Sequence, residues 1–160
     1  MTPLSSEALA SILEPSLPAE IGCFNAGGFD FFLSHVLASS HRYGHYAAIL
    51  MFRLRESSYN GQGLKKLTEI LSGGIRKTDY LGRIGEDTVA VILQHATLES
   101  AQKVLSRLNG ELSNAFAVDP DQIAGSSAVF PTEANTLSTL RDLAEERLAQ
   151  RNNITRGQTN

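Results

Sequence analysis

The feature that most constrains the fold is an uninterrupted apolar run from Ala47 to Phe52. The run is much shorter than the ~20 apolar residues that span a bilayer. It also lacks the alternation of a strand with one wet face, and so it fits a strand that is buried on both sides. We therefore assign a buried strand here and place the other elements around it.

Helical and strand patterns alternate around this run. Before it, apolar side chains at helical spacing predict a helix from Gly28 to about Tyr43, which Gly44 ends. The turn Gly85-Glu86-Asp87 predicts an antiparallel hairpin. The elements predicted after the run are a helix over Gly63–Ile75, strands over Tyr80–Ile84 and Thr88–Leu93, a helix over Leu98–Phe116, a strand over Ile123–Phe130 and a helix from Leu137 to about Gln150.

The order from Ala47 onward is strand, helix, strand, strand, helix, strand. This is the split βαβ, ferredoxin-like order of an α+β fold, with one more helix before it and one after it. With 160 residues and 42% hydrophobic residues, the chain can bury one core. We expect an N-terminal arm over residues 1–20, with a short helix from Ser5 or Ser6 to Leu13. One domain over residues 21–151 and a loose polar tail over residues 152–160 should follow.

Charge and composition argue against several classes of partner. The formal net charge is −3 and the basic residues are scattered, whereas nucleic acids and anionic membranes need a dense basic face. The start, Met1 to Glu7, has no signal-peptide pattern. The single cysteine, Cys23, has no partner for an internal disulfide, which suits a reducing compartment. We therefore expect a cytoplasmic protein that contacts neither nucleic acid nor membrane.

Local motifs add a family resemblance to this layout. Gly85-Glu86-Asp87-Thr88-Val89 stands where the GGDEF family of diguanylate cyclases has its signature hairpin. Cys23-Phe24-Asn25 followed by Phe29 resembles the family's opening segment, and Ala144-Glu145 with Leu148 resembles its final helix. The resemblance implies a ferredoxin-like core of the nucleotidyl cyclase palm type. It also implies the family's reaction, in which GTP molecules on two facing domains are joined.

Compared with the family, the residues for this chemistry are missing. The family holds its metal ions with an aspartate at the end of the first core strand and with the glutamate of the signature. Arg53 and Thr88 stand at these positions. Glu86 replaces the second glycine and brings a Cβ and a negative charge towards the triphosphate. We therefore expect no catalytic residue, no metal and no other cofactor, while Gly85 and Asp87 serve the turn.

Two further parts of the family's site are altered. Arg55 occupies the next acidic position, and only Glu56 to Gln62 is available where the family reads guanine, so that segment is mostly deleted. Asn152 matches a phosphate-facing lysine, although Arg156 stands where a later arginine is expected.

One family feature is intact. Arg76-Lys77-Thr78-Asp79 matches the RxxD inhibitory site, and five residues separate it from Gly85 as in the family. That site binds cyclic di-GMP in the family: an arginine can offer paired donors to guanine or phosphate, and an aspartate can accept from the guanine N–H edge. A structural interpretation stays open, in which Arg76 caps its helix and Asp79 begins the turn into the strand.

The histidines and the cysteine indicate no further site. His41 and His45 have the spacing of a metal pair, but Gly44 breaks the helix between them and no glutamate stands beside His41. His35 and His95 are expected at the surface or with satisfied hydrogen bonds. Cys23 is expected to be a packed thiol.

Three functions are compatible with these residues. The preferred one is a catalytically inactive signalling domain that acts through a protein partner, either itself or another GGDEF-type domain, and that binds cyclic di-GMP through Arg76 and Asp79. The alternative is a nucleotide-independent docking or scaffold domain. An enzyme with altered chemistry has the least support.

Overall fold

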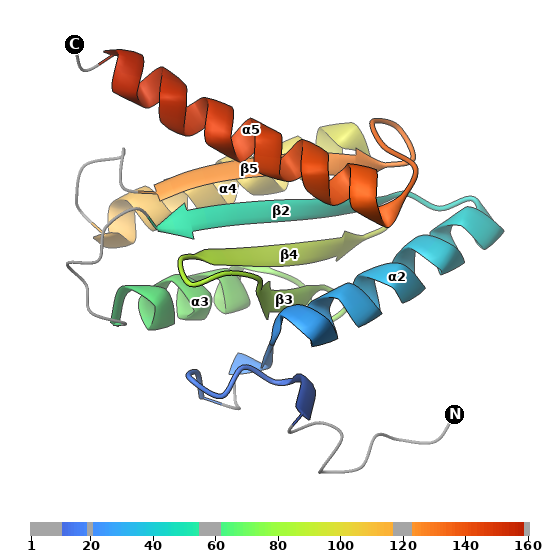
Figure 1. Ribbon diagram of the computed structural model, residues 1–160, viewed down its shortest axis with the longest axis horizontal. Coiled ribbons are helices and arrows are strands. Elements are labelled where there is room, and N and C mark those ends of the chain that lie inside the picture. Colours follow the sequence, from blue (N-terminus) through green and yellow to red (C-terminus); the bar gives the residue numbers. More distant parts are fainter. Residues whose placement is uncertain (1–10, 19–20, 55–61, 117–122, 159–160) are drawn as a thin grey trace.

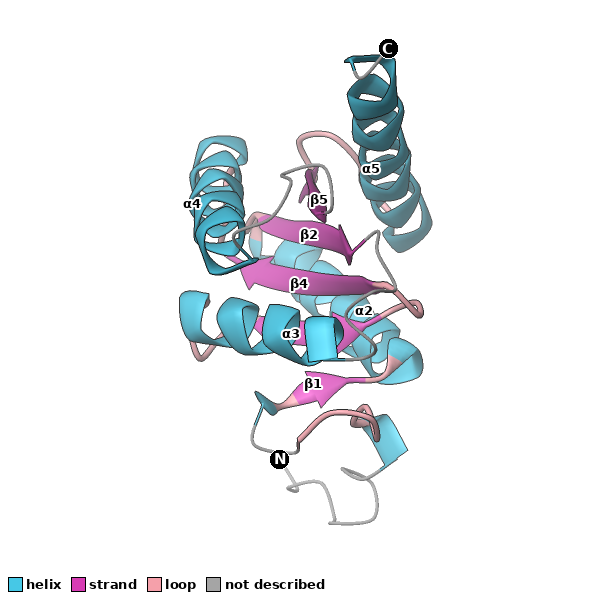
Figure 2. Cartoon of the chain, turned by 90° about the vertical axis from the view of Figure 1, so that its left-hand side faces the viewer, coloured by secondary structure: helices cyan, strands magenta, loops and turns pink. Residues whose placement is uncertain are grey.

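The computed structural model describes residues 11–18, 21–54, 62–116 and 123–158, with side chains up to Gln150. Figure 1 shows helices packed against a single sheet. In Figure 2, α3 and α4 cover one face of the sheet, and α2 and α5 cover the other. The elements are β1 (Cys23–Phe24), α2 (Ala26–Tyr43), β2 (Ala47–Leu54), α3 (Gln62–Gly74), β3 (Tyr80–Arg83), β4 (Thr88–Gln94), α4 (Leu98–Phe116), β5 (Ile123–Phe130) and α5 (Leu137–Gln158).

The apolar run forms β2, which lies between β4 and β5. In the described residues the sheet has five strands in the order β1-β3-β4-β2-β5. β2 pairs antiparallel with both neighbours, β3 pairs antiparallel with β4, and β1 pairs parallel with β3. Successive residues of β2 alternate between two core clusters, one under α3 and α4 and one under α2 and α5. The predicted α+β, ferredoxin-like fold is confirmed.

Most elements agree with their predicted bounds to within two residues. The last helix is longer than predicted and runs to Gln158, where a loose tail was expected after Arg151. No glycine or proline stands before Gly157 to end it. Strand β1 was not predicted, because two residues show no periodicity. The predicted helix start at Ser5 or Ser6 lies outside the described residues.

The described end of the N-terminal arm packs on the domain. Leu13 forms an antiparallel bridge with Phe24 of the edge strand β1. Leu17 is only 8% exposed and belongs to the core. A Cβ at Gly28 would lie 2.7 Å from the Ile12 carbonyl oxygen, so the glycine permits this close approach. Residues 11–18 are therefore part of the folded unit.

Strand β5 is an edge strand whose carbonyl groups find partners outside the sheet. Arg147 on α5 donates from Nη1 to the Ser127 carbonyl oxygen at 2.8 Å. The Glu133 N–H donates to the Val129 carbonyl oxygen at 2.8 Å. Because free edge groups invite pairing with other chains, these bonds protect the edge.

A charged pair holds Arg147 in this position. Its Nη1 donates to Glu133 Oε1 at 3.0 Å, and its Nη2 contacts Oε2. The hydrogen bond from Arg147 holds the pKa of the Glu133 carboxyl below its usual range. The same bond raises the pKa of Arg147.

Glu133→Gln is expected to lower the free energy of unfolding at pH 7 by about 1 kcal/mol, because it removes one charge from a hydrogen-bonded pair. A carboxyl with a lowered pKa stabilises the fold above its unfolded value of about 4.3, and this contribution is lost as the pH falls through the lowered value. The difference from wild type should therefore shrink in acid. Urea unfolding at pH 7 and pH 3 measures it, with the exposed Glu99→Gln as control. A loss of equal size at both pH values would contradict this account.

Candidate functional site

Arg53 and Thr88, which stand at the two metal-binding positions implied by the family resemblance, lie side by side. β2 and β4 pair in a register that sets Arg53 opposite Thr88. Arg53 Nε donates to Thr88 Oγ1 at 3.4 Å and lies 3.9 Å from Asp87 Oδ1. The Thr88 hydroxyl donates to the same Asp87 oxygen at 2.9 Å. In Figure 1, the end of β2 lies beside the β3–β4 hairpin, and the strand register assigns Arg53 and Thr88 to this region.

The side chains of Arg53, Asp87 and Thr88 provide few ligands for a cation. Asp87 supplies their single carboxylate, and that carboxylate already has a guanidinium and a hydroxyl as partners. Within the described ranges, no three His, Cys, Asp or Glu side chains lie close enough to share a metal ion. Arg55 and the segment Glu56–Gly61 lie outside the described residues, as do the side chains of Asn152 and Arg156.

The turn of the hairpin is held by Arg83, a role that the sequence did not indicate. Its Nε donates to the Gly85 carbonyl oxygen and its Nη2 to that of Glu86, both at 3.0 Å. Its Nη1 donates to Glu14 Oε1 at 3.3 Å and to Ser16 Oγ at 2.9 Å. One guanidinium thus joins the hairpin to the N-terminal segment.

In the RxxD segment, Asp79 is buried and fully engaged. Its side chain is 2% exposed. Oδ2 accepts from the Arg76 backbone N–H at 2.9 Å and from Arg76 Nε at 3.4 Å. Oδ1 accepts from the Gln94 N–H at 3.3 Å and from Arg76 Nη2 at 3.5 Å. A carboxylate has about four acceptor positions, so none is left for the guanine edge that was expected to bind there.

Arg76 keeps its guanidinium at the surface, with 63% of its side chain exposed. Its Nη2 also donates to the Gln94 carbonyl oxygen at 2.8 Å. The expected helix cap is formed by another residue, since Arg107 Nη2 donates to the carbonyl oxygen of Gly74, the last residue of α3, at 2.8 Å. The turn role of Asp79 is supported, because its N–H donates to the Arg76 carbonyl oxygen at 3.0 Å.

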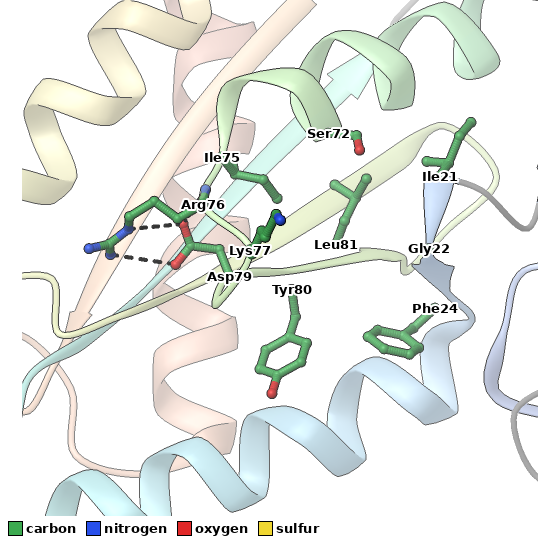
Figure 3. A pocket seen from close by; sticks show the side chains of 10 residues that line it. All are labelled: Ile21, Gly22, Phe24, Ser72, Ile75, Arg76, Lys77, Asp79, Tyr80 and Leu81. Atoms are coloured by element: carbon green, nitrogen blue, oxygen red, sulfur yellow. Dashed lines mark hydrogen bonds and ion pairs between the residues drawn. The ribbon is translucent and has the colours of Figure 1, made fainter. Parts of the chain in front are cut away.

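Two hollows flank the Arg76–Asp79 pair. The first, here called the aromatic hollow, has a volume of about 360 Å³ and includes Phe24 and Tyr80 in its lining. Figure 3 shows these two rings on one side, while the guanidinium of Arg76 extends away from them. The second, here called the basic hollow, has a volume of about 270 Å³, and its lining includes Arg107, His95 and Ser100. Neither Arg107 nor His95 could be assigned to this site from the sequence, because only the fold brings them to Arg76.

Cys23 is a packed thiol, as predicted. It is 2% exposed, and its Sγ donates to the Phe24 carbonyl oxygen at 3.7 Å. Burial, followed by the charge of Glu14, raises the pKa of the Cys23 thiol to about 12. The thiol is therefore protonated and unreactive at neutral pH.

Among the helices that the structure describes, none has the length and hydropathy needed to cross a membrane.

Comparison with known proteins agrees with the family resemblance seen in the sequence. A family model described as "Diguanylate cyclase, GGDEF domain" matches residues 58–158. A comparison with curated proteins gives no match.

Several solved structures share the fold. A DGC protein from Thermotoga maritima has a TM-score of 0.73 and 16% identity, over 80% of this chain and 98% of that chain. The FimX GGDEF domain from Pseudomonas aeruginosa has a TM-score of 0.76 and 15% identity, over 89% and 94%. The GGDEF domain of DgcB from Caulobacter crescentus, in complex with c-di-GMP, has a TM-score of 0.70 and 14% identity, over 88% and 89%.

Arg83→Ala should loosen the hairpin and the N-terminal segment together, because one guanidinium holds both. Hydrogen exchange is expected to speed up by about tenfold or more at the amides of Ile84 and Glu14. Mass spectrometry or NMR measures this, with the exposed Arg42→Ala as control. Faster exchange at Ile84 alone would show that the two segments are not coupled through Arg83.

Proposed function

The chain belongs to the GGDEF family of diguanylate cyclase domains, and on this basis we propose that it is a cytoplasmic signalling domain without cyclase activity, which binds cyclic di-GMP beside Arg76 and acts through a protein partner. The observation that carries the proposal is the Arg53 guanidinium, which lies beside Asp87 where the resemblance implies a metal ion.

Loss of activity follows from the charge at this position. Joining GTP molecules needs divalent ions that neutralise the phosphates, and these ions need carboxylate ligands. A guanidinium cannot ligate a cation. Two like unit charges at about 4 Å repel by about 1 kcal/mol in water and by about 4 kcal/mol near a protein surface, and a divalent ion doubles these values. Arg53 therefore both replaces a ligand and opposes the ion.

The tip of the hairpin adds a second obstacle. Glu86 and Asp87 are both exposed there. The resemblance implies that the triphosphate lies along this turn, where it would meet the Glu86 carboxylate in place of glycine backbone. Binding of GTP at the hairpin is therefore disfavoured.

The purified protein is expected to make no cyclic di-GMP from GTP with Mg²⁺ or Mn²⁺. The double variant Arg53→Asp, Thr88→Glu should also make none, because the segment Glu56–Gln62 is too short to read guanine. Mass spectrometry of the reaction mixture detects the product, with a GGDEF domain of intact signature as positive control. Product from the wild-type protein would refute the proposed loss of activity.

Binding of cyclic di-GMP is supported by the surroundings of Arg76. The guanidinium is exposed, yet it is fixed by Asp79 and by the Gln94 carbonyl oxygen. The aromatic hollow offers rings on which a base can stack. The basic hollow offers donors for a phosphate. A dinucleotide carries both groups, and the DgcB domain is described in complex with this ligand. In this proposal Arg76 contacts the ligand, and Asp79 positions Arg76.

Arg76→Ala is expected to weaken the binding of cyclic di-GMP by about tenfold or more, the usual effect of losing a charged hydrogen bond. Lys65→Ala removes one positive charge from an exposed position of α3 outside the lining of both hollows and should change the affinity by less than about threefold. Isothermal titration calorimetry at pH 7.5 measures both variants. Equal affinity in wild type and Arg76→Ala would refute the assignment of the site. No binding to the wild type would favour the alternative, a nucleotide-independent docking domain.

A protein partner is part of the proposal because a signalling domain that catalyses no reaction must transmit its signal by contact with another protein. The hairpin end carries Glu86 and Asp87 beside Arg53, so charges of both signs share one surface. Such a surface can select a partner and speed association through charge complementarity. A second copy of the chain, or another GGDEF-type domain, is the partner proposed.

A further inference from the structure

The basic hollow combines apolar lining residues, among them Ile75, Leu93 and Val104, with polar side chains that donate hydrogen bonds. Arg107 from α4, Ser100 from the same helix and His95 after β4 line it together with Arg76. The carboxylate in the lining is Asp79, whose acceptor positions are filled by Arg76 and Gln94. The polar part of the hollow therefore presents hydrogen-bond donors from two guanidinium groups, which suit an anionic group.

His95 is held in a fixed place relative to Arg76. The residue before it, Gln94, accepts from Arg76 Nη2 at 2.8 Å and donates its N–H to Asp79 Oδ1 at 3.3 Å. His95 itself has a φ of +57°, which few residues other than glycine adopt. Such a conformation persists where the surrounding structure enforces it.

The imidazole ring of His45, in the turn between α2 and β2, packs against the ring of His95. The rings of His45 and His95 meet edge to face, with their centroids 4.6 Å apart. The Tyr43 ring lies 6.3 Å from that of His45. The charged and titratable groups around the hollow are Arg76 and Asp79 from the α3–β3 turn, and Arg107 from α4 with its ion-pair partner Glu111. His45 and Tyr43 add to them from the α2–β2 turn.

We infer that His95, supported by His45, is a ligand-binding residue of this site and that it contacts a phosphate of the ligand as an imidazolium. The inference rests on the proposed function, since it takes cyclic di-GMP as the source of the phosphate. At about 270 Å³, the hollow is smaller than the ~300 to 1,000 Å³ of pockets that enclose a whole ligand, so it accommodates one part of a dinucleotide.

The consequence is a site that binds more tightly in acid. Imidazole side chains gain a proton as the pH falls through about 6.5. A bound phosphate favours the protonated form, because a charge-assisted hydrogen bond is about twice as strong as a neutral one. Binding at a pH just above this value, where the free imidazole is mostly neutral, should therefore take up a proton, whereas the arginine contacts stay constant across the range.

The test is calorimetric titration with cyclic di-GMP at pH 5.8 and pH 8.0 for the affinity, and at pH 7.0 in two buffers with different heats of ionisation for the proton uptake. Wild type is expected to bind about tenfold more tightly at pH 5.8 than at pH 8.0, and to take up protons on binding at pH 7.0. His95→Asn, chosen because asparagine tolerates a positive φ, should bind equally at both pH values and take up none. His35→Gln, an exposed histidine on α2, should behave as wild type.

The outcomes separate this inference from the function on which it rests. Equal wild-type affinity at both pH values, or an unchanged pH response in His95→Asn, would overturn the inference and leave the cyclic di-GMP site in place. No binding at either pH would overturn both. Proton uptake is measured on the wild type, so the inference stays falsifiable if His95→Asn does not fold.

Discussion

The burial of β2 on both faces is the constraint on which the rest of the structure depends. Its first six residues, from Ala47 to Phe52, are all 0% exposed. Because they alternate between two core clusters, the chain must place two helices on each face of the sheet. The same strand pairs along its length with β4 and β5. Near its end, β2 places the partly buried Arg53 beside the hairpin.

In the proposed function, the hairpin end keeps the family's backbone arrangement while the charge at the metal position is reversed. The register that sets Arg53 opposite Thr88 is a property of the sheet and not of the side chains. A guanidinium can therefore stand where the family resemblance implies a metal ion, with Asp87 as its counter-charge. Arg83 closes the turn from the other side and ties it to the N-terminal segment. The loss of metal ligands that we propose thus need not disturb the fold.

The sequence predicted what depends on local pattern. The helices, the strands and the hairpin follow from the spacing of apolar residues and from the turn residues after Ile84. It did not predict β1 or the docking of residues 11–18, because these rest on a parallel pairing and on the close approach of Ile12 to Gly28. The length of α5 was missed, since its last residues lack an apolar stripe.

For the candidate site too, the sequence predicted what depends on local spacing but not what depends on tertiary contacts. The RxxD spacing located Arg76 and Asp79 but could not show that the carboxylate of Asp79 is filled by backbone and guanidinium donors. Arg107 and His95 reach the basic hollow from α4 and from the end of β4. Their contribution rests on contacts between distant parts of the chain, which spacing along the sequence does not reveal.

The most direct test of the central claim is whether a divalent ion binds between β2 and the hairpin. Mn²⁺ broadens the NMR signals of nearby amides, so titration of the isotope-labelled protein, with and without GTP, locates any bound ion. The account predicts that the amide signals of Arg53, Asp87 and Thr88 broaden no more than those of exposed surface residues such as Glu99. Their selective loss at equimolar Mn²⁺ would contradict it.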